Sequence, residues 1–75
     1  MSKYSLVGVD GNAYSIMGYT GNAMKREGFS KDDVDRMYKE ATSGNYSNII
    51  CVCSDWIDKV NEKIGADEEE DDYED

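Results

Sequence analysis

Histidine and proline are both missing from this chain of 75 residues. Without histidine, there is no imidazole to act as a general base or to complete a catalytic triad. The two cysteines, Cys51 and Cys53, have no evident partner that would activate a thiol for nucleophilic attack. We therefore expect a protein that is not an enzyme.

Cysteine is also too scarce for a cross-link or a zinc site. Cys51 and Cys53 stand two positions apart, a spacing that does not suit an unstrained disulfide, and two thiols alone do not complete a zinc site. The oxygen-rich stretches around Asp10 and Asp32 do not match a calcium-binding loop with its distal glutamate. We expect no metal and no cofactor, and the cysteine usage favours a reduced, cytoplasmic setting.

Long apolar runs and basic stripes are missing as well. No stretch approaches the roughly 20 apolar residues that a membrane span needs, and the start lacks the pattern of a signal peptide. We therefore expect no interaction with a membrane. The eight Lys and Arg residues are scattered and offset by nine acidic residues within residues 1–66, so direct nucleic-acid binding by the body of the chain is not expected.

The acidic residues gather at one end. Eight of the 17 lie in the last nine positions, so residues 1–66 hold 17 − 8 = 9 acidic residues against eight basic ones, a net charge of −1. A run of like charges cannot bury enough apolar surface to offset an ordering cost of roughly 1–2 kcal/mol per residue. We therefore predict a single small helical domain over residues 1–65 and a disordered acidic tail over residues 66–75. The carboxylates of the tail are Asp67, Glu68, Glu69, Glu70, Asp71, Asp72, Glu74 and Asp75.

The chain begins with an apolar segment, from Tyr4 to Val9, whose β-branched and aromatic residues predict a strand. An Asp-Gly pair ends it, and two interpretations follow. In the first, Asp10 or Asn12 caps a helix over residues 13–26, and Gly28 follows its end. The apolar face of this helix comprises Ala13, Ile16, Met17, Thr20 and Met24. In the second, Asp-Gly forms a hairpin turn and residues 13–19 form the second strand. We favour the helix because its pattern continues without a break.

Two further helices are predicted. Ser30 caps the first of them, Phe29 and Val34 have the spacing of a hydrophobic staple, and Gly44 ends it. Its apolar stripe comprises Val34, Met37, Tyr38 and Ala41. The second starts near Ser47 and stops at Gly65. Its stripe comprises Tyr46, Ile49, Ile50, Cys53, Trp56, Ile57, Val60 and Ile64.

The predicted fold is therefore mainly α, a small α+β protein with a short N-terminal strand followed by a three-helix bundle. The alternative is an N-terminal β-hairpin plus two helices. A lone strand leaves backbone N–H and C=O groups unpaired on both edges. The strand over residues 4–9 therefore needs a mate, either the hairpin partner or the same strand in a homo-oligomer.

The stretch after the strand is also the best candidate for partner binding. In a helix, Gly18 and Gly21 form a smooth patch near Tyr14, and small residues beside exposed aromatics suit protein recognition. Closure of the core against the third helix is an equally good role for the two tyrosines of this stretch. The candidate residues are Asp10, Asn12, Tyr14, Gly18, Tyr19 and Gly21. The rival site is the acidic tail, which either occupies a basic groove of a partner or only keeps the protein soluble.

The sequence also resembles a group of small proteins encoded by phages, prophages and mobile elements of gut bacteria. The resemblance rests on the motif Val-Asp-Gly-Asn-Ala-Tyr-Ser-Ile-Met-Gly-Tyr over residues 9–19, and extends through residues 28–34 and 41–50. It covers most of residues 4–60, excludes the acidic tail, and supplies no activity or catalytic residues to transfer. What it implies is a small protein carried by mobile DNA and made inside a host cell.

Three functional hypotheses follow. The leading one is a non-enzymatic interaction protein that inhibits a host protein, with an anti-phage defence protein such as a CRISPR effector as the target. The second is an oligomeric sponge that holds a small nucleotide signal with Asp10, Asn12 and the N–H groups at the start of the first helix. The third is a structural accessory that packs on another phage protein.

Overall fold

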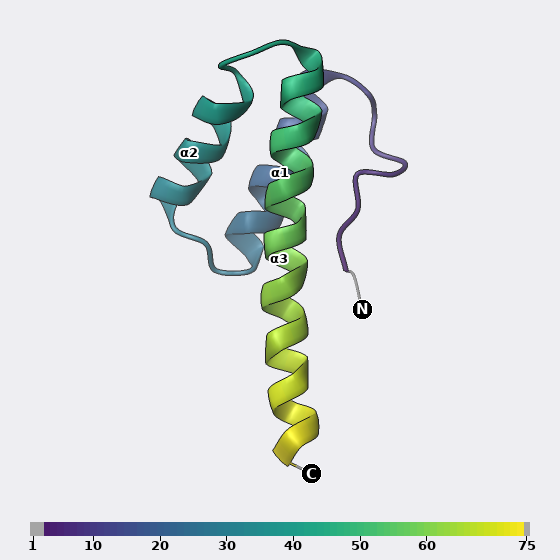
Figure 1. Cartoon of the computed structure of the whole chain (residues 1–75), viewed down its shortest axis with the longest axis vertical. Helices are drawn as coiled ribbons and strands as arrows, with labels where there is room; N and C mark the ends of the chain where they lie inside the picture. The colour runs from purple at the N-terminus through teal and green to yellow at the C-terminus, as the bar shows by residue number, and fades with distance from the viewer. Residues whose placement is uncertain (1–2, 75) are drawn as a thin grey trace.

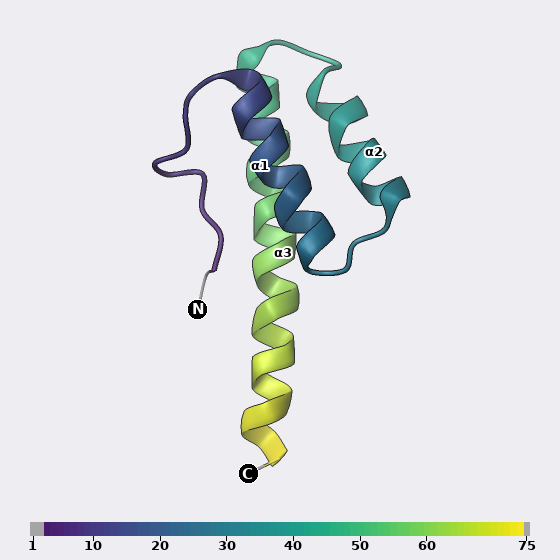
Figure 2. The same ribbon diagram turned by 180° about the vertical axis from the view of Figure 1, so that it is seen from behind.

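A computed structural model describes the backbone of residues 3–74 and the side chains of residues 3–65. It contains three α-helices, α1 (Ala13–Arg26), α2 (Lys31–Ala41) and α3 (Tyr46–Glu74). Helices α1 and α3 run in the same direction with α2 opposed to them, and α3 continues well past the other two (Figures 1 and 2). The predicted small, mainly helical protein with three helices is confirmed.

Helix α1 begins and ends at residues that the sequence marks. The side chain of Asn12 accepts a hydrogen bond from the N–H of Tyr14 at 2.8 Å, which makes Asn12 the N-cap. Gly28 has a φ of 90° beyond the other end. There the N–H of Phe29 donates to the carbonyl of Met24 at 2.9 Å, and the N–H of Gly28 donates to Lys25 at 3.2 Å. These two bonds form a Schellman motif and end the helix.

Polar side chains also organise both ends of α2. Ser30 caps α2 by accepting from the N–H of Asp33 at 3.1 Å, as predicted. At the other end, the Nδ2 of Asn48 donates to the carbonyls of Glu40 at 2.8 Å and Ala41 at 3.1 Å. Because Asn48 belongs to the first turn of α3, one side chain satisfies the last carbonyls of α2 and fixes the start of α3 against it.

The core lies where the three helices meet. Its central side chains are buried almost completely and come from all three helices: Met24, Met37, Cys53 and Val60. Thr20 is the polar member, and its hydroxyl donates to the carbonyl of Ile16 at 2.9 Å, so it enters the core already paired. The apolar stripes that the sequence predicts for the helices therefore do form the core, apart from Tyr38 and Tyr46 at its edges.

Residues 3–9, which we call the N-terminal arm, do not form the predicted strand. No strand occurs within residues 3–74, so both the lone strand and the hairpin alternative are wrong. The arm instead bends at Gly8, which has a φ of 89°, and the N–H of Val9 donates back to the carbonyl of Leu6 at 3.1 Å. A glycine with positive φ at the third position is the pattern of a type II turn.

The backbone of the arm finds its partners in side chains of the helices. Asn61 Oδ1 accepts from the N–H of Lys3 at 3.1 Å and of Tyr4 at 3.0 Å, while its Nδ2 donates to the carbonyl of Tyr4 at 2.9 Å. The N–H of Ser5 donates to the hydroxyl of Tyr19 at 3.0 Å. One carboxamide thus replaces the neighbouring strand that the prediction required, because it offers a donor and an acceptor side by side.

A tyrosine anchors the arm. Tyr4 is buried, lies edge-on to Tyr19 with ring centroids 6.2 Å apart, and donates its hydroxyl to Glu27 Oε2 at 2.7 Å. This hydrogen bond raises the pKa of the Tyr4 phenol and lowers the pKa of the Glu27 carboxyl. Lys3 adds an ion pair with Glu27 at 3.4 Å.

The end of α3 also differs from the expectation. Gly65 does not stop the helix, whose backbone continues to Glu74. The side chains of residues 66–75 lie outside the described part, but the backbone of residues 66–74 is helical, so the predicted disordered acidic tail is not confirmed. No helix found within residues 3–74 is both long enough and apolar enough to cross a membrane.

Candidate interaction surface

Charged residues are distributed unevenly over the sequence, and the fold brings the uncharged stretches together. Residues 4–24 contain a single charged residue, Asp10, and residues 41–54 contain none. Both stretches reach the end of the bundle where α1 and α3 begin (Figure 2). The hydroxyl of Tyr46 donates to the carbonyl of Gly11 and joins them there. We call the surface formed by residues 11–18 and 42–48 the uncharged end.

Two tyrosines are exposed on the uncharged end. The side chain of Tyr14, in the first turn of α1, is 82% exposed, and that of Tyr46, in the first turn of α3, is 50% exposed. Large aromatic side chains in contact with water, with few charges around them, have the composition of the centre of a protein–protein interface. Val7, on the N-terminal arm that precedes α1, is a further exposed apolar side chain, at 90%.

Gly18 lies one helical turn after Tyr14, on the same exposed face of α1. A Cβ atom added to Gly18 would meet no atom within 4 Å, so the surface there is open and lacks a side chain. The exposed face of α1 therefore carries a large aromatic ring beside a smooth patch of backbone. This juxtaposition agrees with the arrangement that the sequence predicts for Tyr14 and Gly18.

Gly21 and Tyr19 have structural roles. A Cβ atom on Gly21 would lie 3.1 Å from the hydroxyl oxygen of Tyr38 and 3.5 Å from Met37 Cε, so this glycine allows α2 to approach α1 closely. Gly18 and Gly21 therefore do not form one patch, because α2 covers Gly21 and leaves Gly18 open. Tyr19 packs against the N-terminal arm, as the hydrogen bond to Ser5 shows.

Asp10 and Asn12 use their side-chain oxygens to start α1. Asp10 Oδ1 accepts from the N–H of Asn12 at 3.2 Å, and Asn12 Oδ1 accepts from the N–H of Tyr14. Both residues are exposed and lie beside the uncharged end. Their local hydrogen bonds fix the first turn of α1, and with it the position of the Tyr14 backbone.

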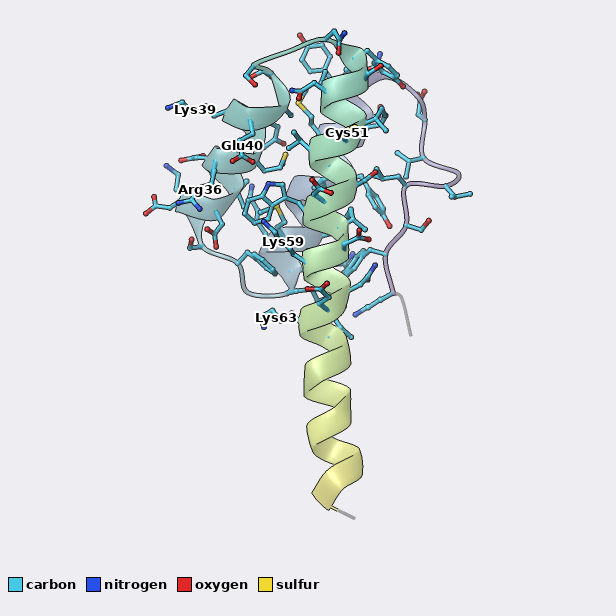
Figure 3. All side chains as sticks on the ribbon, viewed as in Figure 1. Arg36, Lys39, Glu40, Cys51, Lys59 and Lys63 are labelled. Atoms are coloured by element: carbon cyan, nitrogen blue, oxygen red, sulfur yellow. The ribbon has the colours of Figure 1, made fainter. Side chains whose placement is uncertain are left out.

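The charged residues lie on other parts of the molecule. Figure 3 labels Arg36, Lys39 and Glu40 on α2, and Lys59 and Lys63 on α3. Glu40 joins α2 to α3, because Trp56 Nε1 donates to it at 3.3 Å, and within α3 Lys59 Nζ lies 4.2 Å from the centroid of the Trp56 ring. These charged side chains thus also pack against the Trp56 ring, where α2 meets α3.

The two thiols differ in their surroundings. Cys51 is exposed on α3 (Figure 3), and Cys53, two residues later, is buried in the core. Burial raises the pKa of the Cys53 thiol, because the thiolate would lose its solvation there. Among the described residues, no three acidic or thiol side chains gather closely enough to hold a metal ion.

The apolar pattern of the sequence does not indicate that Tyr46 and Val7 are exposed. Tyr46 fits the apolar stripe of α3, which predicts a core position. It lies in the first turn of that helix, where the bundle ends, and its ring is half exposed. The sequence does contain a signal for this exposed surface. The long uncharged stretches of residues 4–24 and 41–54 indicate a surface with few charges wherever their side chains are exposed.

No family model, curated protein or solved structure shows significant similarity to this chain.

Proposed function

We propose that this protein is a non-enzymatic interaction protein of a phage or mobile element, and that it binds a host protein through the uncharged end. The observation that supports the proposal is the exposure of Tyr14, 82%, and Tyr46, 50%, on a surface without charged residues. An isolated exposed apolar residue needs no explanation, but two exposed tyrosines on a surface whose own residues carry no charge suit a contact surface.

The physics of association favours this surface over the charged ones. Covering the uncharged end removes no formal charge from water, so the desolvation cost is small. A tyrosine adds a large rigid ring with only two side-chain torsions to order, and its hydroxyl hydrogen-bonds at the rim. Tyr14 stands on a capped helical turn, which limits the further ordering that binding requires.

The target class that we propose is a host anti-phage defence protein, such as a CRISPR effector, which the protein inhibits by occupying its surface. Support for this setting comes from the resemblance of residues 9–19 to small proteins of phages and mobile elements. The acidic residues at positions 67–75 give the chain a strongly anionic end, which long-range attraction steers toward a basic groove. In this arrangement the uncharged end supplies the close contact and the acidic residues speed the encounter.

The test is binding of the purified protein to a panel of purified host defence effectors, with effector activity measured in parallel. Tyr14→Ala is the diagnostic variant, because an interface anchor of this kind contributes about 2 kcal/mol or more, which corresponds to a loss of affinity of about 30-fold. Glu62→Ala, at an exposed position of α3, is the matched control and should bind like the wild type.

A chain that ends at residue 66 separates the two contributions. It should keep its dissociation rate but associate more slowly at low salt, since a distant charge acts mainly on the association rate. The proposal is wrong if no effector is bound, or if Tyr14→Ala binds and inhibits as well as the control.

A further inference from the structure

The exposed face of α1 is complementary to itself. We propose that, in the absence of a host protein, a second copy of this chain covers it, with the two α1 helices antiparallel and Tyr14 of each copy packed over Gly18 of the other. This inference rests on the proposed function in that it assigns a second occupant to the same surface. It makes self-association a competitor of host-protein binding.

The first argument is shape. Tyr14 projects from α1, and Gly18, one turn later on the same face, is a gap where a Cβ atom would meet nothing within 4 Å. A two-fold axis that crosses α1 midway between these residues brings each ring onto the gap of the other copy. An isologous contact of this type uses one patch twice, which is the commonest way for a protein to form a dimer. Glycine allows the two helix backbones to approach closely.

The second argument is charge along the same face. From residue 13 to residue 24, α1 carries no charged residue on any side. The face is bordered by Asp10 before the helix and by Lys25 in its last turn, and both are exposed. In the antiparallel register, the start of α1 in each copy, with Asp10 just before it, lies toward the end of α1 in the other copy, which carries Lys25. The charges at the two borders of the face are therefore complementary in the dimer, and the centre buries none.

The third argument concerns the acidic ends of the two copies. The chain carries a net charge of −9, and eight acidic residues lie in the last nine positions, at the end of α3. Helices α1 and α3 run in the same direction (Figure 1), so an antiparallel α1 pair directs the two α3 helices away from each other. A parallel pair would place both acidic ends on one side, where they repel. The charge distribution thus selects the antiparallel arrangement.

The experiment is the mass of the full chain in solution, measured by sedimentation from low micromolar to near-millimolar concentration. The wild type should rise from 8.4 kDa toward twice that mass. Gly18→Leu should remain at the monomer mass over the same range, because the leucine fills the gap that Tyr14 of the other copy needs. Since nothing lies within 4 Å of that position, the variant should keep its fold, which its circular dichroism and thermal midpoint verify.

Gly65→Leu is the matched control, since Gly65 is a helical glycine that also has no atom within 4 Å of an added Cβ, but lies in α3. It should dimerise like the wild type. A wild type that stays monomeric, a Gly18→Leu variant that dimerises normally, or equal loss in both variants would each overturn the proposal. A monomeric wild type that still binds an effector through Tyr14 removes only the dimer. A dimer that binds no host protein removes only the proposed function.

Discussion

Replacing Asn61 with alanine tests how the N-terminal arm is held. The carboxamide of Asn61 satisfies both the N–H and the carbonyl of Tyr4, at 3.0 and 2.9 Å, and accepts from the N–H of Lys3 at 3.1 Å. The Lys3 contact is exposed, so water replaces it with little loss. The two contacts with Tyr4 are partly buried, and their loss leaves backbone groups without partners unless the arm moves away.

The magnitude follows from those two bonds. At a net value of about 0.5–1.5 kcal/mol each, they contribute about 1–3 kcal/mol. Alanine offsets this loss of stability by about 0.5 kcal/mol, because it forms helix more readily than asparagine. We therefore expect Asn61→Ala to lower the free energy of unfolding by about 0.5–2.5 kcal/mol, and the thermal midpoint by about 2–20 °C for a domain of this size. If the arm detaches, the burial of Tyr4 is lost as well.

The assay is urea unfolding, followed by circular dichroism and by the fluorescence of Trp56, with amide hydrogen exchange at Tyr4 as the local readout. Asn22→Ala, at an exposed position of α1, is the matched control and should be neutral or slightly stabilising. Asn61→Asp keeps the acceptor but loses the donor to the Tyr4 carbonyl, so its effect should lie between those of the control and alanine. A loss under about 0.5 kcal/mol for Asn61→Ala, with unchanged exchange at Tyr4, would refute this account of the arm.

Three further predictions concern single contacts. Because the folded-state pKa of Glu27 is depressed below its usual 4.5, the hydrogen bond from Tyr4 stabilises the fold above pH 4.5. This stability is lost as the pH falls through the lower, folded-state pKa of Glu27. Glu27→Gln should therefore flatten the acid limb of a pH–stability profile. Gly18→Ala should stabilise α1 by about 0.5–1 kcal/mol in thermal unfolding, and Gly21→Ala should gain clearly less, because its Cβ is crowded by α2. A thiol reagent should modify Cys51 in the native protein within minutes and reach Cys53 only on unfolding; equal rates would contradict the burial of Cys53.

The three helices were predictable because their signals are local. Asn12 and Ser30 cap the helices that follow them, and Gly28 ends α1 with the positive φ that only glycine adopts easily. Apolar periodicity then fixes which side of each helix is buried. Of the candidate site, Tyr14 and Gly18 were placed correctly on an exposed face for the same reason, since helical spacing alone brings them together.

The errors arose where a distant side chain decides the outcome. The segment over residues 4–9 has the composition of a strand, and its backbone does need hydrogen-bond partners. Nothing in the local sequence shows that Asn61, 57 residues away from Tyr4, supplies them. In the same way, the spacing of Gly18 and Gly21 on α1 does not show that α2 covers one and leaves the other open.

The docking of the N-terminal arm has a consequence for the order of folding. The arm is synthesised before the three helices, but the side chain that receives Tyr4 comes 57 residues later, in the second half of α3. Contacts this far apart in sequence close a long loop and form late. During synthesis, α1 and α2 can meet while Asn61 is still inside the ribosome, but the arm cannot yet dock. The arm leaves the ribosome before the three helices but is thus the last of these segments to reach its native place, and Tyr4 and Leu6 stay open to chaperones and proteases until α3 is complete.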